Sequence, residues 1–100
     1  MPRFTAQART RLAHAVAAVT RRDFGAIEKV AHELHTLAGE AGLLGLIAIV
    51  PIARDGEIMA RQLCATQTDE DAPSLLAILD RLAAAVERVE VAPQVPTESA

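Results

Sequence analysis

Aromatic residues and cysteine are scarce in this 100-residue chain. Phe4 and Phe24 are the only phenylalanines, and tyrosine and tryptophan do not occur. Because β-sheets are enriched in aromatic and β-branched residues, this composition disfavours most sheet architectures. The single cysteine, Cys64, excludes an internal disulfide and a multi-cysteine zinc site, and it fits a reducing compartment.

The chain also lacks a long apolar run and an excess of basic charge. The longest apolar run, Leu43 to Val50, contains Gly45 and stops far short of the roughly 20 residues that a membrane span needs. The N-terminal segment carries arginines where a signal peptide would be apolar. With 10 basic and 13 acidic residues, the chain has no uniformly basic surface for nucleic acid. We therefore expect a cytoplasmic protein that binds neither membranes nor nucleic acid.

Residues that favour helices are abundant, with 21 alanines and 11 leucines. Apolar residues recur at intervals of three and four in four segments, which is the helical period. Four amphipathic helices joined by short connections bury their apolar faces together as a bundle. The sequence therefore predicts an all-α, antiparallel up-down four-helix bundle over residues 1–91, followed by a disordered tail over residues 92–100.

Local signals predict where these helices begin and end. The first runs from about Thr5, as its N-cap, to Arg21, and the second follows the N-cap Asp23 and stops at Gly42. The third covers about residues 44–67, with a bend or a late start near Pro51. The fourth has Pro73 in its first position. The residues expected in the core are Ala8, Leu12, Ala15, Val16, Val19, Ile27, Val30, Ala31, Leu34, Leu37, Ala38, Ala41, Leu75, Leu79, Leu82, Val86 and Val89.

His32 is the residue of the second helix that offers chemistry. At about 100° per residue it lies roughly 160° from the centre of the buried stripe, so its side chain is expected to face solvent. An exposed neutral imidazole is a competent nucleophile. Glu28, one turn earlier, is expected to accept a hydrogen bond from one ring N–H and leave the other nitrogen free to attack. Gly39, on the same face, would let another protein approach closely.

The sequence around His32 resembles the histidine-containing phosphotransfer (HPt) domains of phosphorelays. These domains show an alanine before the histidine, a leucine two residues after it, a lysine at three, a glycine at four, a small residue at six and a glycine at ten. Ala31 precedes His32, and Leu34, Ala38 and Gly42 follow at the matching distances. The resemblance implies a four-helix bundle with a solvent-facing histidine midway along its second helix.

Two positions counted from His32 depart from the family pattern. His35 stands in place of the lysine, and Thr36 stands in place of the first glycine. The lysine is thought to help hold the phosphoryl group, and His35 can do so only when it is protonated, so we expect a weaker, pH-dependent contact. Thr36 narrows the space for an incoming partner.

The resemblance implies a phosphoryl carrier that is not itself a kinase. His32 would accept a phosphoryl group from the aspartyl phosphate of a receiver domain and pass it to another receiver. Mg²⁺ is expected on the receiver, so the chain is expected to need no cofactor and to hold no metal. The expected partners are response-regulator receiver domains, a hybrid histidine kinase, or both. The residues expected beside the phosphoryl group or the partner are Glu28, Lys29, His35, Thr36 and Gly39.

Three other interpretations follow from the sequence. The departures at His35 and Thr36 favour a non-phosphorylated, HPt-like adaptor that binds a receiver or kinase domain. A metal site on Glu28, His32 and His35 is disfavoured, because three ligands on one straight helix diverge. A dimeric structural bundle would need an exposed apolar patch, which the sequence does not obviously supply.

Overall fold

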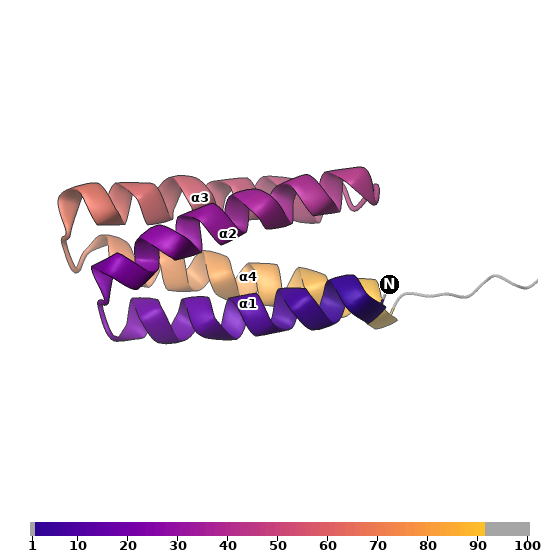
Figure 1. Ribbon diagram of the computed structural model, residues 1–100, viewed down its shortest axis with the longest axis horizontal. Coiled ribbons are helices and arrows are strands. Elements are labelled where there is room, and N and C mark those ends of the chain that lie inside the picture. Colours follow the sequence, from indigo (N-terminus) through magenta and orange to yellow (C-terminus); the bar gives the residue numbers. More distant parts are fainter. Residues whose placement is uncertain (1, 92–100) are drawn as a thin grey trace, which may run out of the picture.

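The computed structural model describes residues 2–91 and places them in an antiparallel bundle (Figure 1). Its helices are α1 (Pro2–Thr20), α2 (Phe24–Leu43), α3 (Ile49–Thr66) and α4 (Asp71–Val91), and no strand occurs in the described part of the chain. The α1–α2 and α3–α4 loops lie at one end of the bundle, and the α2–α3 loop lies at the other. The all-α, up-down prediction is confirmed, whereas the predicted tail lies outside the described residues.

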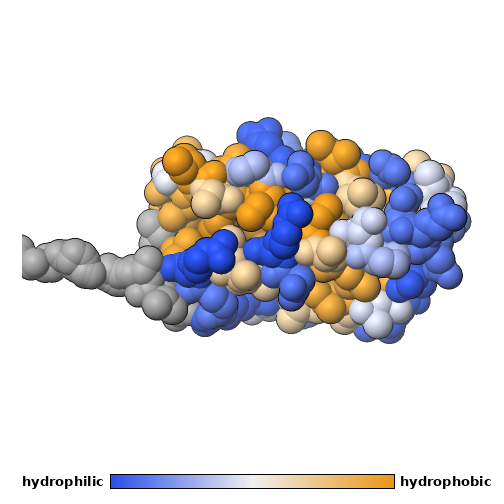
Figure 2. All heavy atoms as spheres, turned by 180° about the vertical axis from the view of Figure 1, so that it is seen from behind, coloured by the Kyte–Doolittle hydropathy of each residue, from blue (hydrophilic) through white to orange (hydrophobic). Residues whose placement is uncertain are grey.

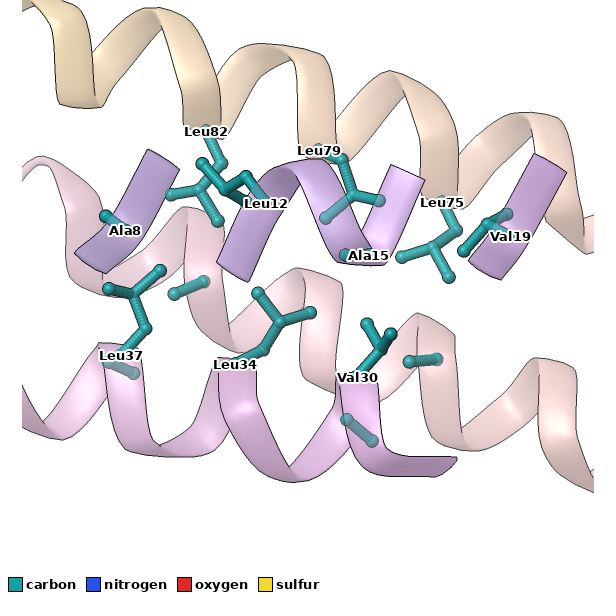
Figure 3. Close-up of a cluster of buried hydrophobic side chains, with 14 of the residues drawn as sticks. Ala8, Leu12, Ala15, Val19, Val30, Leu34, Leu37, Leu75, Leu79 and Leu82 are labelled. Atoms are coloured by element: carbon teal, nitrogen blue, oxygen red, sulfur yellow. The ribbon is translucent and has the colours of Figure 1, made fainter. Parts of the chain in front are cut away.

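The core is built from the inward faces of all four helices. Each helix packs against its neighbours in the chain, and α4 closes the bundle against α1. Figure 3 shows leucines of α1, α2 and α4 pointing toward a common centre, among them Leu12, Leu37 and Leu82. Each fully buried leucine stabilises the fold by roughly 1.5–3 kcal/mol relative to an exposed one. This packing buries one face of α2 in the core and leaves the opposite, outer face toward solvent.

Most of the predicted core residues are buried, with two differences. The predicted residues of α2 are all buried. Val16, in contrast, is 40% exposed, so its predicted burial is wrong. It lies at the mouth of a groove between α1 and α4, where Leu76 and Asp80 of α4 form the opposite wall. Val89 is only partly buried near the end of α4. Both residues lie at the margins of the packed interfaces, which periodicity alone does not locate.

The predicted helix starts are right for α2 and wrong for α1. Asp23 caps α2, and its side chain accepts a hydrogen bond from the backbone N–H of Ala26 at 3.2 Å. Helix α1 begins at Pro2, so Thr5 is not its N-cap but a buried residue inside the helix, 1% exposed. Proline is tolerated in a first turn because the N–H that it lacks would have no partner there. Pro2 is therefore a better indicator of the start of α1 than the capping side chain of Thr5.

Prolines and a glycine define the other helix ends. Helix α3 begins at Ile49, which confirms a late start that keeps Pro51 in the first turn. Helix α4 begins at Asp71, so Pro73 lies in its third position and not, as predicted, in its first. Helix α2 extends one residue beyond Gly42. The chain then turns at Gly45, whose φ of +75° is a conformation that glycine adopts without strain.

Gly56 allows α3 to approach α2 closely. It is buried, and a Cβ atom at this position would lie 3.0 Å from Leu34 Cδ1 and 3.3 Å from Ile78 Cγ2. Real Cβ atoms rarely have contacts this short, so a side chain here would require Leu34, Ile78 or the helices to shift. The residue that follows, Glu57, lies in this closely packed part of α3.

Exposed apolar residues are few and dispersed. Figure 2 shows, on the face seen from behind, apolar residues in patches between hydrophilic ones. Leu43, Leu44 and Ile47 are exposed together around the α2–α3 loop, and Ile58 is exposed on α3. None of the helices over residues 2–91 combines the length and apolarity that a bilayer crossing requires. Leu43, Leu44 and Ile47 belong to the apolar run Leu43 to Val50, and the sequence pattern did not predict their exposure.

Candidate functional site

His32 lies on the outer face of α2, where the helical period predicts it. Its side chain is exposed, while Ala31 and Leu34 beside it are buried. Within residues 2–91 the His32 ring has no hydrogen-bond partner. The predicted orientation of His32 is therefore correct, but no protein group holds either of its ring nitrogens.

The expected hydrogen bond between Glu28 and His32 is not formed among the described residues. Glu28 lies on the flank of α2 that faces α3, near Cys64. Burial raises the pKa of the Cys64 thiol, and the nearby charge of Glu28 raises it further. The thiol donates a hydrogen bond to the backbone carbonyl of Phe24 at 3.7 Å, so Cys64 packs as a structural residue. Glu28 does not orient the His32 ring.

A carboxylate does orient the second histidine of this helix, His35. The His35 Nδ1 atom lies 3.2 Å from Oε1 of Glu57, which comes from α3. The His35 side chain is 68% exposed, whereas that of Glu57 is 16% exposed. The ring therefore has one edge against a largely covered carboxylate and the other toward solvent.

Arg61 holds Glu57 in this position. Its Nε and one terminal nitrogen donate hydrogen bonds to Oε2 of Glu57 at 3.1 and 2.8 Å. Each carboxylate oxygen thus has its own partner, Oε1 for His35 and Oε2 for Arg61. Burial raises the pKa of Glu57, but the hydrogen bonds from Arg61 and His35 outweigh it and lower the pKa below the ordinary value. The carboxylate is ionised at neutral pH and fixed in direction.

Sequence reasoning missed Glu57 and Arg61. They lie on α3, more than twenty residues after His35, so no spacing within α2 points to them. The available signal was local to α3, because a glutamate four residues before an arginine is a typical helix-surface pair. Only the packing of α3 on α2 shows that this pair also meets an imidazole.

The residues that follow the two histidines leave different amounts of space. Thr36, one turn after His32, is partly buried, and its hydroxyl donates a hydrogen bond to the backbone carbonyl of His32 at 3.2 Å. Gly39, one turn after His35, is exposed, and a Cβ atom there would have no neighbour within 4 Å. The helix surface is therefore partly covered beside His32 and open beside His35.

Lys29 lies on the opposite flank of α2, toward α1. It lines a groove with His14 of α1 and with Arg21, which directly follows α1, and Glu33 of α2 lies in the same groove. The side chains of Lys29, His14 and Arg21 thus lie together along one edge of the outer face of α2. His14 is exposed.

Other arginines of the first helix and its loop are tied into ion pairs between elements. Arg11 contacts Glu40 of α2 at 2.9 Å. Arg22 contacts Asp69 at 2.9 Å and so joins the two loops at one end of the bundle. The basic N-terminal segment therefore contributes partly to the bundle itself and only through Arg21 to the groove beside Lys29.

No metal centre accompanies these groups in the described part of the chain. Glu28, His32 and His35 do not converge, and no three carboxylate, imidazole or thiolate groups of residues 2–91 are placed to hold one ion. The chemistry of this face rests on its imidazoles.

The described residues form a four-helix bundle that presents His32 and His35 on the outer face of its second helix. A comparison with family models identifies the Hpt domain over residues 2–92. The chain therefore belongs to the Hpt domain family, whose members carry phosphoryl groups in two-component signalling and are not kinases. Comparisons with curated proteins and with solved structures return no match.

Proposed function

We propose that this protein is a phosphorelay carrier that receives a phosphoryl group from one receiver domain and delivers it to another. The observation that carries the proposal is the outer face of α2, where exposed imidazoles stand beside open helix surface. His32, which the sequence predicts as the acceptor, and His35 are the two candidates on this face. A carrier needs little more than such a face, because its partners bring the rest of the site.

The transfer is a displacement at phosphorus. An imidazole nitrogen attacks the phosphorus of the receiver's aspartyl phosphate, the N–P bond forms and the acyl P–O bond breaks. The aspartate carboxylate leaves with the bonding electrons. The receiver supplies Mg²⁺ and most of the charge stabilisation, so the carrier contributes position and a nucleophile. Transfer to the next receiver reverses these steps.

Charge near the site supports docking of an acidic partner pocket. Lys29 and Arg21 line one edge of the face beside His32, where the carboxylate of Glu33 offsets part of their positive charge. Complementary charge speeds the encounter of two proteins and orients the complex. The free thiol of Cys64 fits a protein that functions in the reducing cytoplasm, where receiver domains would meet the carrier.

The test is transfer of labelled phosphoryl groups from a panel of phosphorylated receiver domains to the intact chain. We expect acid-labile label on the wild type and none on a variant that carries both His32→Gln and His35→Gln. Tight binding without label on any histidine would support the non-phosphorylated adaptor. Receivers that only donate and receivers that only accept would establish the direction of flow.

A further inference from the structure

We infer that His35, positioned by Glu57, is the phosphoryl-accepting residue of this face. The inference rests on the proposed carrier function, in which the natural phosphoryl donor is a receiver domain. It differs from the acceptor that the sequence predicts, His32, and it assigns Glu57 a role in directing the His35 ring. Three independent observations support it: the ring's hydrogen bond, the space beside it and the spacing of the residues that follow.

The hydrogen bond determines which nitrogen of His35 can react. The Glu57 carboxylate can only accept, so Nδ1 of His35 carries the proton and donates it across the 3.2 Å contact. In that tautomer Nε2 holds the lone pair. Because Nε2 lies on the opposite edge of a ring that is 68% exposed, the reactive nitrogen is directed away from Glu57.

Glu57 also stabilises the product of the attack. When Nε2 bonds to phosphorus, the ring retains its Nδ1 proton and gains positive charge. An ionised carboxylate that already accepts the Nδ1 hydrogen bond offsets this charge without moving. His32 has no such group among the described residues. Glu57 is a positioning residue, since it acts through His35 and does not touch the phosphoryl group.

The space beside the ring favours the same histidine. A helical glycine costs roughly 0.5–1 kcal/mol relative to alanine, so a glycine with no internal reason is best explained by an external one. Gly39 has no neighbour within 4 Å of a Cβ position, and its φ is not among the positive values of the chain. It lies one helical turn after His35. The same place relative to His32 is taken by Thr36, whose side chain bonds to the helix backbone.

The residue spacing supports His35 as well as His32. The distances of the family pattern can be counted from either histidine. Counted from His35, the leucine at two, the glycine at four, the small residue at six and the glycine at ten are Leu37, Gly39, Ala41 and Gly45. This register restores the glycine at four that the His32 register lacks. It places Ala38 at the lysine position and Leu34 before the histidine.

The first experiment identifies the acceptor without a receiver. The full chain is incubated with phosphoramidate, a small donor whose N–P bond breaks as ammonia leaves and the imidazole N–P bond forms. The wild type, His35→Gln, His32→Gln and His14→Gln are compared by peptide mass spectrometry that preserves phosphohistidine. We expect rapid labelling to disappear in His35→Gln alone. Rapid labelling that persists in His35→Gln and disappears in His32→Gln would overturn the inference.

The second experiment examines the role of Glu57. Because Glu57 fixes Nδ1 as the donor, NMR of the phosphorylated chain should place phosphorus on Nε2 of His35. Glu57→Gln should slow labelling of His35 several-fold and leave the slower labelling of His14 unchanged. Phosphorus on Nδ1, or an unchanged rate in Glu57→Gln, would contradict the positioning role. Circular dichroism of each variant separates loss of reaction from loss of fold.

The same variants are then tested with a phosphorylated receiver. If phosphoramidate labels His35 and no receiver does, the acceptor is identified while the carrier function fails. If receivers label the chain at His32, the carrier function holds while the inference about His35 fails. The two hypotheses therefore fail in different experiments.

Discussion

The α2–α3 and α1–α4 helix pairs are each bridged by a glutamate and a basic side chain, yet the two bridges differ. Between α1 and α4, Arg9 donates two hydrogen bonds to Glu87 at 2.7 and 2.9 Å, and both side chains are about half exposed. Between α2 and α3, His35 meets Glu57, whose side chain is largely covered and also accepts hydrogen bonds from Arg61.

The difference shows how a bundle surface directs a side chain. An exposed ion pair competes with water and contributes little to stability or geometry. A carboxylate covered on most sides and bound at both oxygens has one orientation, and it passes that orientation to the imidazole. The α1–α4 groove is lined mainly by apolar residues and contains no histidine among its lining residues, so it has no comparable nucleophile.

The largest expected effect comes from changing the distance between α2 and α3. Gly56→Val should destabilise the protein by about 1–3 kcal/mol, because the new side chain overpacks against Leu34 and Ile78. Chemical denaturation measures the effect. The same change should slow labelling of His35, since α3 and Glu57 move away from α2.

Gly39→Ala is the matched control for this substitution. The added methyl group meets nothing within 4 Å, and alanine favours the helix by roughly 0.5–1 kcal/mol. We therefore expect unchanged or slightly higher stability. Equal destabilisation by both substitutions would show that the close packing at Gly56 does not distinguish the two positions.

The sequence predicted the bundle because periodicity, caps and composition all indicate the same helices. It predicted His32 as the acceptor, although the residues around His32 and His35 repeat with a shift of three. The repeated pairs are His32 and His35, Leu34 and Leu37, Ala38 and Ala41, and Gly42 and Gly45. A shift of three nearly preserves the face of a helix, so spacing and amphipathicity support both registers.

Tertiary contacts supply what the pattern within α2 lacks. Glu57 meets His35 where α3 packs on α2 beside Gly56, and neither Gly56 nor Glu57 is near His35 in the sequence. The errors at Thr5 and Val16 have a similar origin. Thr5 carries a good capping side chain but lies within a helix that starts at Pro2, and Val16 has the right period but lines a groove between α1 and α4.

A smaller effect is expected from Glu57→Gln, and it should depend on pH. The hydrogen bonds from Arg61 and His35 lower the pKa of Glu57 below its ordinary value of 4.5. A carboxyl group whose pKa is lowered on folding stabilises the folded protein at pH values above the pKa that it has in the unfolded chain. This stabilisation is lost as the pH falls through the pKa that the group has in the folded protein. We expect a loss of about 1 kcal/mol near neutral pH, because the bonds join charged groups.

Urea denaturation of wild type and Glu57→Gln across the acidic range measures this difference. The two proteins should converge as the pH falls below 4.5, where the wild-type carboxyl becomes protonated. A constant difference at all pH values would indicate a packing effect of the substitution and not the loss of an ionised acceptor. Rescue of His35 labelling by Glu57→Asp would show that a carboxylate is required there.

The smallest effect is expected at the other bridge. The hydrogen bond from Arg9 lowers the pKa of Glu87, but both groups are exposed and solvent screens their interaction. Glu87→Gln should therefore leave the thermal midpoint without measurable change at neutral pH, and it should leave His35 labelling unaffected. A loss of stability as large as that of Glu57→Gln would mean that the number of hydrogen bonds, and not burial, decides what each bridge contributes. Adding salt separates the two explanations, because only an exposed pair is weakened by screening.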